Sequence, residues 1–229
     1  MDAIILAGGK GTRLAPLTNF LPKALVLVGG KAIIEHTLES LPDAITRVCI
    51  VIGEHGEQII QHLEQRYHTL PVTYVRQNEP KGTGHAFLLT GSHIRSDRFL
   101  VLNGDDLYDK AELTAMLQHP RAMAVHPSLP KSERYLAIMT NDDQTIAGHR
   151  YPEHLGEPIL VGTGAYLLDR TIFLIQPVAI NGTKEYGLPH AVLQLAQSHP
   201  ITAHHMHRWF QINDHADLAR AEQRFSHDY

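Results

Sequence analysis

Glycines and cations are concentrated near the start of the chain, in a composition that suits phosphate binding. The residues concerned are Leu6, Ala7, Gly8, Gly9, Lys10, Gly11, Thr12 and Arg13. Glycines let backbone N–H groups approach phosphate oxygens without a Cβ in the way, and Arg13 adds a forked, charge-assisted donor. The spacing is neither Walker A nor the dinucleotide fingerprint. A glycine turn that merely joins a strand to a helix is the alternative, and the glycines alone favour that alternative.

Polar residues also follow the apolar run at 99–102. Asn103, Gly104, Asp105 and Asp106 come directly after that run, which predicts carboxylates at the carboxyl edge of a parallel sheet, where open α/β folds bind ligands. Mg²⁺ suits such a place because it needs few protein oxygens and keeps water and substrate phosphates in its other positions. Asp105 is the first candidate for a metal ligand. Asp106 is second, because it could instead cap or turn the loop.

Gln77 and the turn at Gly82 and Thr83 form a third candidate group. A side-chain amide both donates and accepts hydrogen bonds, so it can read the edge of a base. The alternative is an ordinary strand–loop–helix connection in which Thr83 caps the helix. Taken by themselves, the residues favour this alternative.

The elements that must position these residues alternate between strand and helix patterns. Short apolar runs predict buried parallel strands at 3–7, 47–52, 72–75 and 99–102. Helical spacing of apolar residues predicts helices between them, at 33–41, 57–67 and 84–91. This alternation indicates an α/β fold with a Rossmann-like, mostly parallel sheet and helices on both faces.

The pattern becomes irregular after about residue 120. Strand patterns occur at 122–126, 135–139, 160–168 and 201–207, and helical patterns at 186–197 and 216–225. No linker divides the 229 residues, so we expect a single domain over residues 1–229.

Composition and charge argue against several classes of partner. The formal net charge is -4 with no block of like charges, so no nucleic-acid partner is expected. No run approaches the roughly 18 apolar residues of a membrane helix, and the N-terminus lacks a secretory signal. We therefore expect a cytoplasmic protein without a membrane partner.

Cysteine and histidine suggest no chemistry of their own. The single cysteine, Cys49, lies in an apolar strand pattern and is interpreted as part of the core. His204, His205 and His207 cluster on a predicted strand, but they lack the complete spacing of a transition-metal site.

The stretch from Gly8 to Thr18, followed by Leu21-Pro22-Lys23, resembles the signature of sugar-1-phosphate nucleotidyltransferases. The similarity continues from Gly30 to Glu35, with Ala32 where the family commonly has proline. The resemblance implies that the glycine loop and Arg13 hold nucleotide phosphates and that Lys23 contacts phosphate near the reacting centre. We expect a nucleotide-binding half over about 1–120 and an acceptor-binding half over about 121–229.

Two later stretches are similar to particular branches of this family. The stretch from Gln77 to Ala86 resembles the base-binding stretch of uridylyl- and thymidylyltransferases, which favours base binding there. Residues 211–222 resemble the closing segment of N-acetylglucosamine-1-phosphate uridylyltransferase domains, where the position of Asn213 supplies the second magnesium ligand. The alternative is that Asn213 or Asp214 starts the last helix, and we expect Asp214 to cap it.

The resemblance is weakest over the acceptor pocket. Gly162 stands where N-acetylglucosamine enzymes have asparagine, His149 falls near their sugar-binding glutamate, and Pro189 and His190 replace a threonine and an aspartate. These departures indicate another acceptor, such as a different hexose 1-phosphate, N-acetylmuramate 1-phosphate or phosphocholine, or a loss of activity. The acceptor contacts that the resemblance leaves are Lys23, Asn103, Gly164 and Glu185.

The resemblance implies a magnesium-dependent enzyme that transfers a nucleoside monophosphate from a nucleoside triphosphate, UTP favoured, to a sugar 1-phosphate and releases pyrophosphate. An acceptor phosphate with a second pKa of about 6 is already ionised, so neither a protein nucleophile nor a general base is needed. Arg13, Lys23 and Asp105 are the expected catalytic residues, and Asp105 and Asn213 the expected Mg²⁺ ligands.

Three alternatives stay open for the function. The first is cytidylyl or thymidylyl transfer to an acceptor such as phosphocholine. The second is a non-catalytic nucleotide-sensing domain. The third is a glycosyltransferase, against which the absence of an Asp-x-Asp motif argues.

Overall fold

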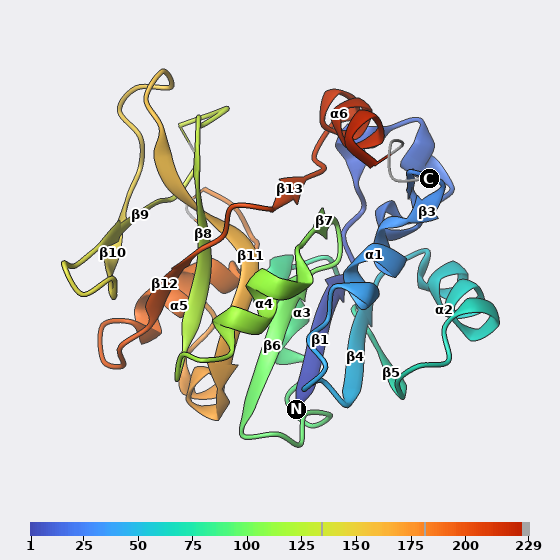
Figure 1. Ribbon diagram of the computed structural model, residues 1–229, viewed down its shortest axis with the longest axis horizontal. Helices are drawn as coiled ribbons and strands as arrows, with labels where there is room; N and C mark the ends of the chain where they lie inside the picture. The colour runs from blue at the N-terminus through green and yellow to red at the C-terminus, as the bar shows by residue number, and fades with distance from the viewer. Residues whose placement is uncertain (134, 181, 226–229) are drawn as a thin grey trace.

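One seven-stranded sheet runs through the computed structural model, which describes residues 1–133, 135–180 and 182–225 (Figure 1). Its strands are β1 Asp2–Ala7, β4 Arg47–Ile52, β5 Val72–Arg76, β6 Arg98–Asn103, β8 Ala122–Ser128, β11 Ile159–Asp169 and β12 Thr202–His205. Their order is β12-β8-β11-β6-β1-β4-β5. Neighbouring strands are parallel except at β11, which runs antiparallel to β6 and β8. The prediction of a mostly parallel sheet is confirmed.

Helices cover both faces of this sheet, which is why its central strands β1, β4 and β6 consist mainly of buried apolar residues. Ala3 and Ile5 of β1 face one buried cluster, and Ile4 and Leu6 face the other. The first cluster is completed by α1 Ile33–Glu39, α2 Gly56–Arg66 and α4 Lys110–Met116. The second is completed by α3 Gly82–Leu88 and α5 Leu188–Leu195. The predicted two-faced arrangement is therefore confirmed.

The core contains both the single cysteine and an aromatic stack. Cys49 on β4 is buried, and burial raises the pKa of its thiol to about 12, which keeps it protonated and unreactive. Phe87 of α3 stacks on Phe99 of β6 and on Phe173. Burial of a side chain of this size contributes about 1.5–3 kcal/mol, so the stack ties α3 firmly to the sheet.

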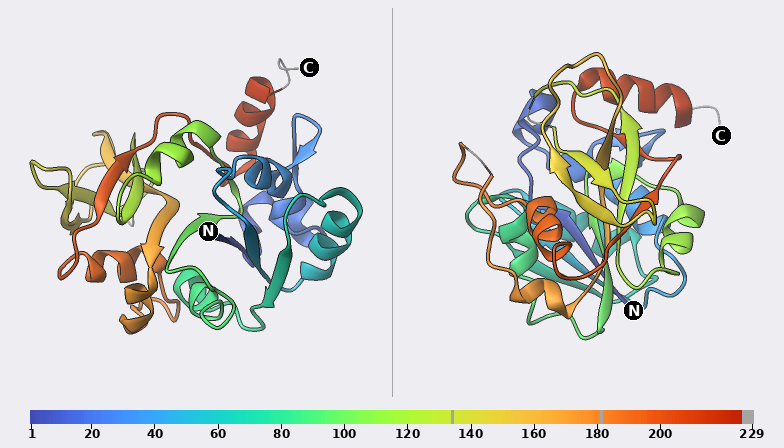
Figure 2. Two further views of the ribbon diagram at one scale, coloured as in Figure 1. Left: turned by 60° about the horizontal axis from the view of Figure 1, so that its bottom comes forward. Right: turned by 90° about the vertical axis from the view of Figure 1, so that its left-hand side faces the viewer.

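The strand at 146–150 was not predicted from the sequence, whereas its hairpin partner overlaps the strand predicted at 135–139. The strands β9 Ala137–Thr140 and β10 Ile146–Arg150 form an antiparallel hairpin outside the main sheet. The hairpin packs on β11 and α5 (Figure 2). Of the five β10 residues, Ile146 alone is buried, so β10 lacks the alternation that marks a half-buried strand. Helix α4 was not predicted either, because only Leu113 and Met116 of its residues are buried, and two buried positions do not establish a helical period.

The end of the chain returns to its beginning. Strand β13 Phe210–Gln211 pairs with β7 Asp106–Leu107, and α6 His215–Phe225 packs on the hairpin of β2 Leu27–Val28 and β3 Lys31–Ala32. A small buried cluster joins them, formed by Leu14, Val26, Val28, Ile33, Leu107, Ile212 and Ala221. Residues after 210, which were expected in the acceptor-binding half, therefore pack on the other half. The division into halves and the single domain stay predictions.

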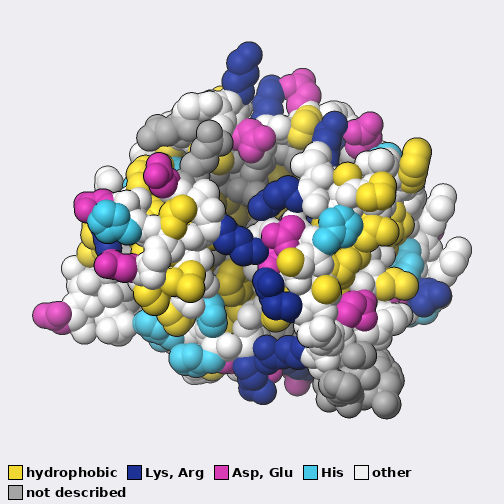
Figure 3. Space-filling view, turned by 90° about the horizontal axis from the view of Figure 1, so that it is seen from above, with side chains coloured by type: hydrophobic (Ala, Val, Ile, Leu, Met, Phe, Trp, Pro, Cys, Tyr) yellow, Lys and Arg dark blue, Asp and Glu magenta, His cyan; other side chains and the backbone are white. Residues whose placement is uncertain are grey.

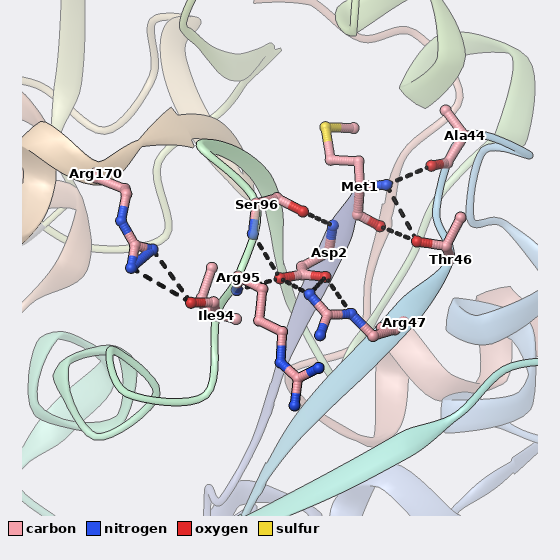
Figure 4. A network of polar contacts seen from close by, with 9 residues as sticks. All are labelled: Met1, Asp2, Ala44, Thr46, Arg47, Ile94, Arg95, Ser96 and Arg170. Atoms are coloured by element: carbon pink, nitrogen blue, oxygen red, sulfur yellow. Dashed lines mark hydrogen bonds and ion pairs between the residues drawn. The ribbon is translucent and has the colours of Figure 1, made fainter.

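A polar network around Asp2 closes the amino edge of the sheet (Figure 4). The carboxylate of Asp2 accepts hydrogen bonds from the Arg47 guanidinium at 2.7 to 2.9 Å and from the backbone N–H groups of Arg95 and Ser96 at 2.7 and 3.0 Å. Burial acts to raise the pKa of Asp2, but these donors outweigh it and hold the pKa below its ordinary value. The network ties β1 to β4 and to the segment before β6.

No helix among the described residues is long and apolar enough to cross a membrane.

Candidate active site

A cleft of about 530 Å³ opens at the carboxyl edge of the sheet, where β1 and β6 end. Figure 3 views this edge from above and shows Lys and Arg side chains gathered at its centre around acidic ones. The residues predicted for the nucleotide all line the cleft: Leu6, Ala7, Gly8, Gly9, Lys10, Gly11, Thr12, Arg13, Gln77, Gly82 and Thr83. Lys23, Asn103, Asp105 and Glu185 line it too. Of the predicted site residues, Gly164 and Asn213 lie outside this lining.

The conformation of the glycine loop depends on contacts with Thr18 and Lys23, which follow it in the sequence. Gly11 has a φ of +61°, and a Cβ built there would lie 2.9 Å from the Cβ of Lys23, so this position requires glycine. The hydroxyl of Thr18 donates to the Gly11 carbonyl oxygen at 2.8 Å. A Cβ built on Gly9 would meet nothing within 4 Å. Gly9 therefore leaves space above the loop for a ligand.

Lys23 and Asp105 form an ion pair in the wall of the cleft. The Nζ of Lys23 lies 2.7 Å from Oδ2 of Asp105, and the two side chains are 8% and 40% exposed. The ammonium is thus held in a largely buried position by the carboxylate, while the carboxylate itself stays accessible to a ligand in the cleft.

Asp106 has a different environment from its neighbour. Its side chain is buried, and both burial and the charge of Asp105 raise its pKa well above the ordinary value. It begins β7, opposite Gln211 of β13, and does not line the cleft. This placement favours a structural role for Asp106 over metal binding.

Asn213 lies next to the glycine loop although it is far away in sequence. Its Oδ1 accepts a hydrogen bond from Nη2 of Arg13 at 3.1 Å, across 200 residues of chain. The next residue, Asp214, accepts a hydrogen bond from the backbone N–H of Asp217 at 2.9 Å, as the cap of α6. Because Asp214 caps the helix, the side chain of Asn213 is left to face Arg13.

Asp105 and Asn213 together offer one carboxylate and one amide oxygen. Such oxygens suit Mg²⁺, which takes few protein ligands and coordinates substrate phosphates as well. Within the described ranges, no three His, Cys, Asp or Glu residues lie close enough to hold a metal ion. His204 instead contacts His119, with Nδ1 of the first 3.3 Å from Nε2 of the second.

The side chain of Gln77 is oriented by its neighbours. Its Nε2 donates to the Gly82 carbonyl oxygen at 3.1 Å and to Nδ1 of His85 at 3.0 Å. Its Oε1 lies beside Gly8, since a Cβ built on Gly8 would be 3.0 Å from that oxygen. Both amide hydrogens are therefore engaged by protein acceptors, and the carbonyl oxygen of the amide is on the side of the glycine loop.

Thr83 and Gly82 have structural roles that depend on a distant segment. The Thr83 hydroxyl accepts from the backbone N–H of Leu188 at 3.1 Å and so caps α5, while its own helix α3 has no side-chain cap. The alternative in which Thr83 caps its own helix is wrong. Gly82 has a φ of +86°, and a Cβ there would clash with the carbonyl oxygen of Tyr186. Both roles arise from the packing of the 185–188 segment on this turn.

A smaller pocket of about 230 Å³ adjoins the cleft and shares Thr83 and Asn103 with it. Gly164 lies at this junction with a φ of +78°, and a Cβ there would clash with the Asn103 side chain. Gly162 and Pro189, two of the departures from the family pattern noted in the sequence, also line this pocket. The remaining lining is mostly apolar or aromatic and was not identified from the sequence: Met123, Tyr135, Leu136, Ile138, Val161, Tyr166, Trp209 and Gln211. These residues come from separate segments, so no local motif could have marked them.

Two of the departures from the family pattern meet in space. The rings of His149 on β10 and His190 on α5 have centroids 6.3 Å apart, and neither ring lines the smaller pocket. Burial, followed by the charge of His149, lowers the pKa of His190.

The profile of a family described as nucleotidyl transferase matches residues 2–186. The UTP–glucose-1-phosphate uridylyltransferase AglF of Haloferax volcanii is 34% identical over 100% of this chain and 98% of its own. The bifunctional protein GlmU of Methanocaldococcus jannaschii is 29% identical over 88% of this chain, which covers 48% of that longer protein. A UDP-glucose pyrophosphorylase solved with UDP-glucose has a TM-score of 0.81 at 19% identity, covering 100% of this chain and 99% of its own. The similarity to this pyrophosphorylase shows that the two proteins share a fold.

Proposed function

Because the chain belongs to the nucleotidyl transferase family, we propose that it transfers a uridylyl group from UTP to a hexose 1-phosphate, forming a nucleoside-diphosphate sugar and pyrophosphate. One observation carries this proposal: the glycine loop, Arg13, Lys23 and Asp105 converge in a single cleft. The uridylyltransferase of Haloferax volcanii, similar over its whole length, supports the choice of substrates.

The reaction needs charge stabilisation more than it needs a protein nucleophile. A phosphate oxygen of the acceptor bonds to the α-phosphorus, and the bond from that phosphorus to the oxygen bridging to the β-phosphate breaks. The electron pair leaves on pyrophosphate. Arg13 and Lys23 neutralise negative charge that builds on the phosphates, and backbone N–H groups of the glycine loop hold them in line.

Asp105 and Asn213 are the residues we propose to hold Mg²⁺. When bound, the ion would neutralise phosphate charge and orient the reacting groups. The exposure of Asp105 to the cleft and the position of Asn213 beside Arg13 support this assignment. The contact with Lys23 then holds the Asp105 carboxylate in place at the wall of the cleft.

The orientation of Gln77 favours a uracil base. With both hydrogens of its amide engaged by Gly82 and His85, Oε1 is left to accept a hydrogen bond. Uracil and thymine present a donor at N3, whereas the N3 of cytosine is an acceptor. A uridine or thymidine nucleotide therefore fits this amide better than a cytidine nucleotide.

Phosphocholine is a second candidate acceptor, and the smaller pocket favours it. Tyr135, Tyr166 and Trp209 line this pocket, and aromatic faces attract quaternary ammonium groups. Cytidylyl transfer to phosphocholine would use a cytidine nucleotide as the donor. The orientation of Gln77 disfavours a cytosine base.

The test is pyrophosphate release from UTP, CTP, dTTP and ATP in the presence of Mg²⁺. Each nucleotide is paired with glucose 1-phosphate, N-acetylglucosamine 1-phosphate and phosphocholine. We expect turnover with UTP and a hexose 1-phosphate, and its loss when Mg²⁺ is chelated. If no pair is turned over, the chain is a nucleotide-binding domain without this activity and the proposal is wrong.

A further inference from the structure

A lysine in the loop between β8 and β9 reaches the first turn of α6. The Nζ of Lys131 lies 3.0 Å from Oδ1 of Asp217 and 3.2 Å from Oδ2 of Asp214. The Asp217 side chain is only 5% exposed and also pairs with Arg220. Lys131 therefore places a cation between two carboxylates that would otherwise repel each other within one helical turn.

Asp217 in turn holds the backbone of the proposed metal ligand. Its Oδ2 accepts from the backbone N–H of Asn213 at 3.0 Å. The side chain of Asn213 contacts Arg13 of the glycine loop. A continuous series of polar contacts thus runs from Lys131 through Asp217 and Asn213 to Arg13.

The other end of the same loop faces the smaller pocket. Tyr135 and Leu136 line that pocket, and so does Trp209, which lies four residues before Asn213. The loop therefore touches the pocket beside the reacting centre at one end and the Asn213 segment at the other.

We propose that Lys131 is a positioning residue, which acts through Asp217 to hold Asn213 where it serves the nucleotide phosphates and their metal ion. The inference rests on the proposed function. The Lys131 side chain is 50% exposed, and exposed ion pairs add little to stability. Removal of its charge should therefore disturb the position of Asn213 without unfolding the protein.

The test compares Lys131→Met, which keeps an apolar stem but no charge, with Lys131→Arg, which restores the cation. Mn²⁺ binding in the presence of UTP, with no acceptor, is measured by electron paramagnetic resonance. Loss of a residue that orients a metal ligand weakens metal affinity about 10- to 100-fold, and we expect this loss in Lys131→Met. Lys131→Arg should bind Mn²⁺ nearly as well as the unsubstituted protein. In turnover, kcat should fall more than the KM for UTP rises.

Lys110→Met is the matched control. It removes an exposed ion pair with Asp43, at 2.5 Å, from residues outside the cleft. The control should leave Mn²⁺ affinity and kcat unchanged.

Three results would overturn the positioning role: unchanged Mn²⁺ affinity in Lys131→Met, an equal loss in Lys110→Met, or no recovery in Lys131→Arg. A protein that binds Mn²⁺ with UTP but turns over no acceptor refutes the proposed function alone. In that case the Mn²⁺ comparison still decides the role of Lys131.

Discussion

Replacement of Asp105 by asparagine separates the chemistry of this carboxylate from its part in the fold. Its Oδ2 accepts from Lys23 at 2.7 Å, and an asparagine carbonyl oxygen can accept in the same place. The exchange turns an ion pair into a hydrogen bond to a charged donor, so we expect the free energy of unfolding to fall by only about 1–2 kcal/mol.

The activity should respond far more strongly than the stability. The substitution removes the negative charge that we propose as a metal ligand, and metal stabilisation of transferring phosphate is worth several kcal/mol. A loss of about 3–4 kcal/mol corresponds to a roughly 100- to 1000-fold fall in kcat. Pyrophosphate release and urea unfolding of the same preparations measure the two effects.

Asp142→Asn provides the control, because Asp142 is exposed and lies outside the cleft. It should match the unsubstituted protein in both assays. Near-normal turnover by Asp105→Asn would refute the metal assignment. A variant that is inactive because it is unfolded would instead refute the reasoning about the Lys23 contact.

Three further predictions concern the glycine loop, the base and the amino edge of the sheet. Gly11→Ala should lower the free energy of unfolding by about 1–2 kcal/mol, because of its positive φ and the Lys23 contact. Gly9→Ala should be as stable as the unsubstituted protein in the same urea titration, yet it should bind UTP more weakly because its Cβ would occupy the ligand space. Equal stability of Gly11→Ala and Gly9→Ala would contradict the loop geometry. Gln77→Leu should raise the KM for UTP about 5- to 10-fold by removing an acceptor for the base, and an unchanged KM would show that this amide does not contact the base. The pKa of Asp2 is lowered in the folded protein. The network around Asp2 should therefore stabilise the protein at pH values above the ordinary Asp pKa of about 3.9, and this stabilisation should be lost as the pH falls through the pKa of Asp2 in the folded protein. Asp2→Asn should therefore be about 1–3 kcal/mol less stable at pH 7, and urea titrations at pH 7 and pH 3 should show the difference shrinking in acid.

The sequence alone predicted those parts of the fold whose signal is local. A buried parallel strand is a short apolar run wherever it lies, so the strand at 47–52 was placed at its observed bounds. The glycine loop and Asp105 could be located for a similar reason, since each directly follows such a strand. Strand β10 was missed because it contributes a single buried side chain, and a pattern needs several.

The tertiary structure decided which of these local features meet. Asn213 contacts Arg13 across 200 residues because Leu14 and Ile212, their chain neighbours, enter one buried cluster with α6 and the β2–β3 hairpin. Thr83 caps α5 instead of its own helix because the 185–188 segment packs on its turn. Lys131 carries no motif, and its place beside Asp217 follows from how the β8–β9 loop lies over α6. Local patterns indicate which face of a helix or strand is buried, but they do not indicate which other element packs on that face. That packing partner determines which residues meet in the site.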